Sequence, residues 1–139
     1  MGGRVGLKGT DGKDILNKAV SLGAKPIAQI RTQEALEPLL SFKNKLEIQT
    51  CPVPMGEQIV KDSGFKPIIL PLSLGQNTSA QDTVRAARLM KDNQVDLLLF
   101  TGGDGTARDI YQAVGNTLLV LGIPAGVKIH SAVYASNPV

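Results

Sequence analysis

The chain alternates between short apolar runs and stretches whose apolar residues recur at helical spacing. The apolar run at residues 95–100, interrupted only by Asp96, and the continuous apolar run at 118–121 predict strands that are buried on both faces. Shorter apolar runs at 26–30 and 66–70 predict further strands, and so does the alternation of apolar and polar residues at 46–50. Proline ends the last two of these segments, at Pro52 and at Pro71. Five strands are therefore expected, and polar or glycine-containing segments separate them.

Helices are expected between these strands. The periodic pattern predicts them over residues 13–22, 33–41, 56–63, 79–93 and 107–114. Thr32 is the expected N-cap of the second helix, and Thr78 or Ser79 that of the fourth, while Gly23 and Gly64 are expected helix ends. For Asn77, Thr78 and Ser79, capping is favoured over contact with a ligand, and Arg85 and Arg88 are expected on a solvated helix face.

The alternation of strands and helices predicts the fold class. Strands that are apolar on both faces favour a mostly parallel sheet covered by helices on both sides, that is, a doubly wound, three-layer α/β sandwich. Right-handed crossovers place the loops at 101–106 and 122–126 at the same edge of this sheet. A length of 139 residues fits one domain over residues 1–139. Because the chain opens in a glycine-rich loop with no strand before it, we expect a fragment of a longer protein.

Composition narrows the function classes. The net charge of +3 is scattered along the chain, which argues against a nucleic-acid partner. The one cysteine, Cys51, cannot form an internal disulfide and is expected to be structural, as in a reducing cytoplasm. No apolar run approaches the roughly 20 residues of a membrane span, so no membrane contact is expected.

The segment Thr101-Gly102-Gly103-Asp104-Gly105-Thr106 carries the candidate chemistry, because it links a predicted strand to a predicted helix. Glycines allow the backbone to approach a phosphate closely, and a helix N-terminus directs N–H groups and a positive dipole end at an anion. The segment is thus interpreted as a phosphate cradle that includes a carboxylate. The alternative is a tight turn with a capping Asp or Thr.

Three segments together resemble a known family. Gly102-Gly103-Asp104-Gly105-Thr106 is similar to the signature of the kinases that include NAD kinases, diacylglycerol and sphingosine kinases and, more distantly, phosphofructokinases. Residues 2–12 and 122–131 are similar to the first and second glycine loops of the ATP-NAD kinase-like branch, which also includes acetoin-catabolism-associated proteins. The resemblance spans nearly the whole chain.

The resemblance implies a kinase that uses ATP or polyphosphate as phosphoryl donor, Mg²⁺ as counter-charge and the 2′-hydroxyl of NAD as acceptor. It implies that Asp104 acts as the base or orients that hydroxyl, and that Gly102, Gly103, Gly105 and Thr106 line phosphates. The family also has a second, mostly β domain that this chain does not encode, so the fragment alone is expected to be inactive and prone to self-association.

Other candidates remain open at this level. Lys128 is a predicted phosphate ligand beside His130, for which a structural role is favoured over catalysis. Arg4 and Lys8 would contact a ligand in the intact protein, or belong to a disordered end in a fragment. Asp104 at the helix start can also act as an N-cap, which conflicts with a role as base because capping lowers the pKa of the carboxyl.

A non-catalytic nucleotide-binding module is the main alternative function. A lipid or sphingoid-base kinase is disfavoured, because it would need an apolar acceptor channel and these residues supply none.

Overall fold

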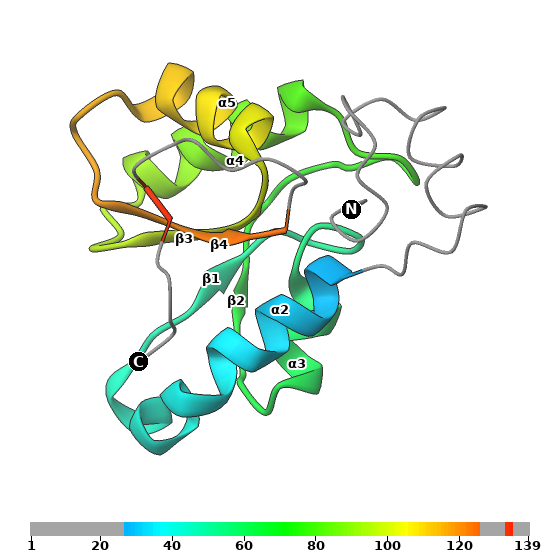
Figure 1. Ribbon diagram of the computed structural model, residues 1–139, viewed down its shortest axis with the longest axis vertical. Coiled ribbons are helices and arrows are strands. Elements are labelled where there is room, and N and C mark those ends of the chain that lie inside the picture. Colours follow the sequence, from blue (N-terminus) through cyan, green and yellow to red (C-terminus); the bar gives the residue numbers. More distant parts are fainter. Residues whose placement is uncertain (1–26, 126–132, 135–139) are drawn as a thin grey trace.

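Two pairs of parallel strands form the centre of the fold in the computed structural model, which describes residues 27–125 and 133–134 (Figure 1). Strand β1 (Gln49–Thr50) pairs with β2 (Ile68–Ile69), and β3 (Leu98–Gly102) pairs with β4 (Val120–Pro124). The longer pair runs in register from Leu98 opposite Val120 to Gly102 opposite Pro124. The predicted α/β class with parallel strands is confirmed, and hydrogen bonds divide the described strands into two pairs.

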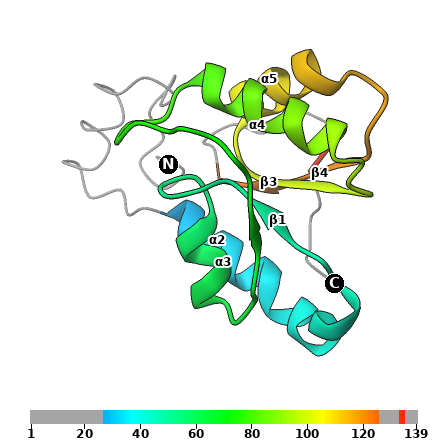
Figure 2. The ribbon, with the colours of Figure 1, turned by 180° about the vertical axis from the view of Figure 1, so that it is seen from behind.

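Helices cover both sides of these strands. Helix α4 (Ala80–Asp92) and helix α5 (Asp104–Val114) lie on one side of β3 and β4. Helix α2 (Ile27–Leu36), the 3-10 helix η1 (Glu37–Lys45) and helix α3 (Glu57–Asp62) lie on the other. The view from behind shows the same order (Figure 2). The three layers that the sequence predicts are therefore present.

Strand β3 separates two hydrophobic clusters because its side chains alternate between its faces. Leu98 and Phe100 point to the α4 and α5 side, where they pack with Ala87, Ile110 and Val114. Leu99 points to the opposite side and packs against the cluster of Leu36, Val60 and Phe65. Because both faces of β3 pack in this way, the strand that leads into the glycine loop lies between the α4 and α5 layer and the α2 and α3 layer.

A third cluster joins the shorter strand pair to α4. It consists of Cys51, Leu70 and Ala86, with partly buried methionine and leucine side chains around it. Cys51 is 4% exposed, and burial raises the pKa of its thiol to about 11. A thiol with so high a pKa is protonated and unreactive at neutral pH. The predicted structural role of Cys51 is confirmed.

The predicted strand at 26–30 and the helix start at Thr32 are wrong. Residues 27–36 form one helix, α2, and Thr32 lies inside it. A short apolar run does not distinguish a strand from a buried helix turn, and here packing against the strands favours the helix. The α-helix ends at Leu36 because Pro38 has no N–H for the next bond of the ladder, and the chain continues as η1.

Strand β4 also differs from its prediction. It begins at Val120 and continues to Pro124, so that Gly122 belongs to the strand and not to a loop. A Cβ at Gly122 would lie 2.6 Å from the ring of Tyr134 and 2.8 Å from that of Phe100, so only glycine leaves room for both rings. Leu119 just before the strand and Leu121 within it are 69% and 36% exposed, so burial on both faces holds for β3 and not for β4.

Helix α4 begins as the sequence predicts. The hydroxyl of Ser79 accepts a hydrogen bond from the Asp82 N–H at 3.4 Å, and the Asp82 carboxylate accepts one from the Ser79 N–H at 2.9 Å. These two bonds form a capping box. Arg85 pairs with Asp82, and Arg85 and Arg88 are exposed as expected. The predicted helix at 13–22 and its end at Gly23 lie outside the described residues.

We expect Ser79→Ala to lower the free energy of unfolding by about 1 kcal/mol, because the N-cap acceptor is lost. Urea denaturation followed by circular dichroism measures this change. Thr78→Ala is the matched control, since Thr78 is exposed and precedes the cap. Equal midpoints for the two variants would contradict the prediction.

The pH dependence of stability should include a contribution from Asp82. The Arg85 guanidinium and then the Ser79 N–H hold the pKa of the Asp82 carboxyl below its ordinary value of 3.8. The unfolded chain therefore binds this proton more readily, and the stabilisation is present above pH 3.8 and lost as the pH falls through the folded pKa. In acid titrations, Asp82→Asn should flatten the loss of stability below this pH relative to the unchanged chain.

Candidate functional site

The glycine loop connects the end of β3 to the start of α5. Gly103 is the N-cap, with an extended backbone (φ −110°, ψ −168°), and the helix begins at Asp104, three residues earlier than predicted. The Ala107 N–H donates to the Gly103 carbonyl at 3.1 Å. The N–H groups of Gly103, Gly105 and Thr106 precede this first helical bond, at the positive end of the dipole of an 11-residue helix. This is the geometry that the cradle interpretation requires.

The exits of β3 and β4 lie side by side. The carbonyl of Gly102 accepts a hydrogen bond from the N–H of Ala125 at 3.0 Å, directly after β4 ends. The prediction that both glycine-containing segments reach the same edge is confirmed as far as Ala125. The rest of the second segment, from Gly126 onward, lies outside the described residues.

Gly102 and Thr106 are in close contact. A Cβ at Gly102 would lie 2.6 Å from Thr106 Oγ1 and 2.9 Å from Thr106 Cβ. A side chain at position 102 would therefore push the first turn of α5 away from the end of β3. The lack of a side chain at Gly102 allows the strand to turn directly into the helix.

The loop is accessible from solvent. Each residue from Thr101 to Thr106 is partly exposed, so the exit of β3 does not lie beneath another described element. Asp104 occupies the first position of α5 because Gly103 is the N-cap, and the alternative with Asp104 as N-cap is therefore wrong. A carboxylate in the first helical turn lies beside the N–H groups that would face a phosphate.

One residue next to this loop could not be identified from the sequence. Thr32 Oγ1 in α2 lies 2.6 Å from Thr101 Oγ1, the first hydroxyl of the motif. These residues are 69 positions apart, and no local pattern connects them. The other predicted ligands, Lys128, His130, Arg4 and Lys8, lie outside the described residues, and their roles stay predictions.

Two grooves lie away from the loop. One of about 240 Å³ is bordered by Lys43, Phe65 and Lys66, and one of about 420 Å³ by Tyr111, Leu119 and other residues between the end of α5 and the start of β4. Neither groove includes a residue of the glycine loop. The larger one lies beside the end of α5 and the start of β4, whereas the loop lies at the start of α5 and near the end of β4. The candidate site is therefore the backbone of the glycine loop, and neither groove belongs to it.

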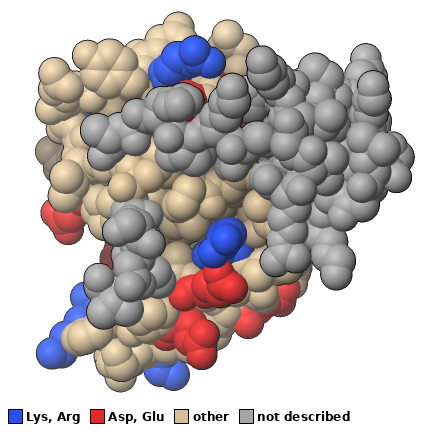
Figure 3. Space-filling view, in the orientation of Figure 1, with Lys and Arg blue, Asp and Glu red and all other residues tan. Residues whose placement is uncertain are grey.

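Charged groups are dispersed over the described surface. Figure 3 shows acidic and basic side chains next to one another on the face that it presents. Arg31 and Glu34, for example, form an exposed ion pair at 3.5 Å. In the described part of the chain, no group of three or more His, Cys, Asp or Glu could enclose a metal ion, and no helix is long and apolar enough to cross a membrane.

The family follows from a comparison with known proteins. Residues 15–138, which include the whole glycine loop, match the family model of the ATP-NAD kinase N-terminal domain. The chain belongs to this family. The predicted resemblance to ATP-NAD kinases is thus confirmed, and membership supports a kinase-like, phosphoryl-transferring function. No curated protein and no solved structure matches the chain.

We expect Gly102→Ala to destabilise the domain by about 1–3 kcal/mol, because the added methyl group overpacks the contact with Thr106. Gly75→Ala is the matched control: its Cβ would meet its nearest atom, the Asn77 carbonyl oxygen, at an ordinary 3.7 Å. Thermal unfolding of both variants measures the difference. Similar unfolding temperatures would show that the loop tolerates a side chain at position 102.

Proposed function

We propose that this chain forms the nucleotide-binding part of an ATP-NAD kinase. In this proposal the donor is ATP, or polyphosphate, and the acceptor is the 2′-hydroxyl of NAD, which yields NADP. The observation that carries the proposal is the exit of β3 into the first turn of α5, with Asp104 at the first helical position. Membership in the ATP-NAD kinase family supports it.

The backbone supplies the electrostatic complement to a phosphate chain. Phosphoryl transfer depends mainly on positioning and on neutralising charge, with little covalent chemistry from the protein. The N–H groups of Gly103, Gly105 and Thr106 and the dipole of α5 favour an anion at the helix start, and the Thr106 hydroxyl adds a donor. Gly102 contributes indirectly, because the contact of its backbone with Thr106 fixes the position of these N–H groups.

Asp104 is the reactive group in this proposal. A carboxylate beside the cradle accepts the proton of the attacking hydroxyl, or orients that hydroxyl toward the phosphorus. It also suits Mg²⁺, which proteins bind through one or two carboxylates together with substrate phosphates. The described residues near the loop fit such a site, with Asp104 as the protein ligand and the nucleotide supplying the remaining oxygens. Mg²⁺ would supply charge neutralisation at the phosphates.

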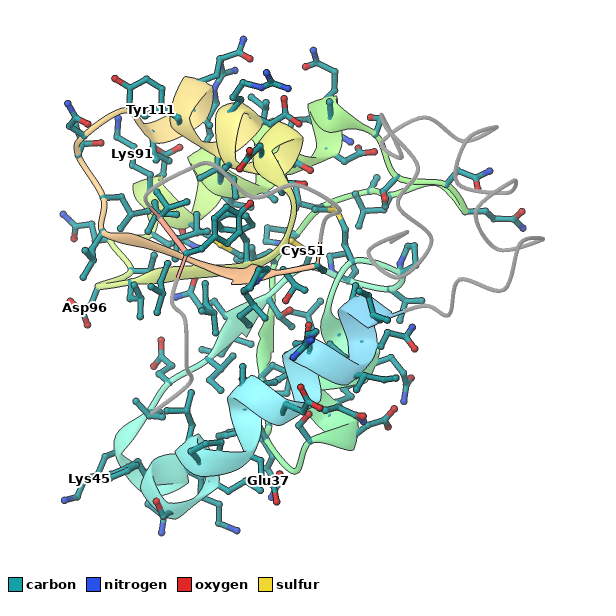
Figure 4. All side chains as sticks on the ribbon, viewed as in Figure 1. Glu37, Lys45, Cys51, Lys91, Asp96 and Tyr111 are labelled. Carbon is teal, nitrogen blue, oxygen red and sulfur yellow. The ribbon has the colours of Figure 1, made fainter. Side chains whose placement is uncertain are left out.

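The test is Asp104→Asn in the intact protein. We expect turnover of ATP and NAD to fall by about 10²- to 10⁴-fold, because the amide cannot accept the proton, while the fold is retained. Coupled detection of NADP measures turnover, and near-ultraviolet circular dichroism checks the fold. Asp96→Asn is the matched control, since Asp96 is exposed near the opposite end of β3 (Figure 4).

Unchanged turnover in Asp104→Asn would reject the assigned role. Calorimetric titration of the unchanged protein with ATP and with NAD separates the enzyme from its main alternative. Tight binding of both without any product would identify a non-catalytic nucleotide-binding module.

A further inference from the structure

The hydroxyl of Thr32 links α2 to the start of the glycine loop. Thr32 Oγ1 and Thr101 Oγ1 are 2.6 Å apart, and both side chains are partly buried. Thr101 directly precedes Gly102, so this contact is made where β3 turns toward α5. Thr101 faces α2 because it shares the strand face of Leu99, which packs on that side.

The direction of this hydrogen bond follows from the second bond of Thr32. The Thr32 hydroxyl donates to the carbonyl of Ala28 at 2.7 Å. A threonine hydroxyl has one proton, so Thr32 can only accept from Thr101, and Thr101 must donate. The proton of Thr101 is therefore directed at α2. Its oxygen can accept a hydrogen bond from a ligand but cannot donate one to a phosphate, which leaves Thr106 as the donor hydroxyl of the motif.

The other contacts between β3 and the α2 side are less directional. Leu99 packs against Leu36 and its neighbours, and such apolar contacts depend little on orientation. A hydrogen bond of 2.6 Å, by contrast, requires a narrow range of distance and angle. Among the described strands, β3 forms backbone hydrogen bonds only with β4. The position of β3 relative to α2 therefore depends on contacts between side chains.

We propose that Thr32 is a positioning residue for the phosphate-binding loop. It acts through Thr101, by holding the end of β3 in register with α2 and so fixing where the N–H groups of Gly103, Gly105 and Thr106 point. The ligand concerned is the phosphate chain of a nucleoside triphosphate. This inference rests on the proposed function, and it adds an element far away in the sequence to the site.

The experiment is a double-mutant cycle with Thr32→Val and Thr101→Val in the intact protein. Valine keeps the shape of threonine and removes the hydroxyl. Calorimetry with Mg-ATP gives the dissociation constants at a temperature where all variants are folded. We expect each single variant to bind about three- to tenfold more weakly, as for the loss of one hydrogen bond. The double variant should bind no more weakly than the worse single variant, because both changes remove the same contact.

Two further variants separate positioning from stability. Thr32→Ser retains the hydroxyl and should bind Mg-ATP within about twofold of the unchanged protein, a difference smaller than the loss of one hydrogen bond. Thr117→Val is the matched control, because the Thr117 hydroxyl donates to the Val114 carbonyl at 2.6 Å near the far end of α5. It should lower stability and leave Mg-ATP affinity unchanged.

Three outcomes overturn the inference. If Thr32→Val is less stable but binds Mg-ATP as tightly as the unchanged protein, Thr32 has a structural role only, and the proposed function stands. If the losses of affinity add in the double variant, the two hydroxyls act independently. If the unchanged protein neither binds Mg-ATP nor forms product, the proposed function fails and this inference fails with it.

Discussion

No side chain fits between the end of β3 and the first turn of α5. The Cα of Gly102 lies so close to Thr106 that a methyl group would overlap its hydroxyl, and the carbonyl of Gly102 is bound to the N–H of Ala125. Strand, helix and neighbouring strand therefore meet at one backbone position. The direction of the helical N–H groups, and with it any affinity for a phosphate, depends on this close approach.

The rest of the fold holds β3 in the position that this approach requires. Leu98 and Phe100 anchor one face of the strand under α4 and α5, and Leu99 anchors the other face over α2 and α3. Gly122 admits the rings of Phe100 and Tyr134, whose centroids are 5.6 Å apart, close to β4. The glycine loop thus begins at the end of a strand that packs against helices on both faces. This packing fixes the start of the loop, while the loop residues stay accessible to solvent.

Much of this could be predicted from the sequence because the relevant signals are local. Residues 97–100 are apolar without interruption, which is typical of a strand that is buried on both faces. The N-cap of α4 was predicted to be Thr78 or Ser79, and Ser79 is the cap because Asp82 three residues later completes its capping box. The glycine motif, together with two further glycine-containing segments, indicated the kinase family through its resemblance to that family's signature.

Other features depend on contacts between distant segments. The run at 26–30 is too short to define its own structure, and packing beside β3 and β4 makes it part of α2. Gly122 looks like a loop residue until the rings of Phe100 and Tyr134 are placed around it. The sequence by itself determined that an apolar strand leads into the glycine loop and that a helix follows it, because short-range patterns encode both. The tertiary structure alone decided that Thr32 reaches Thr101, since a hydrogen bond across 69 residues leaves no periodic trace.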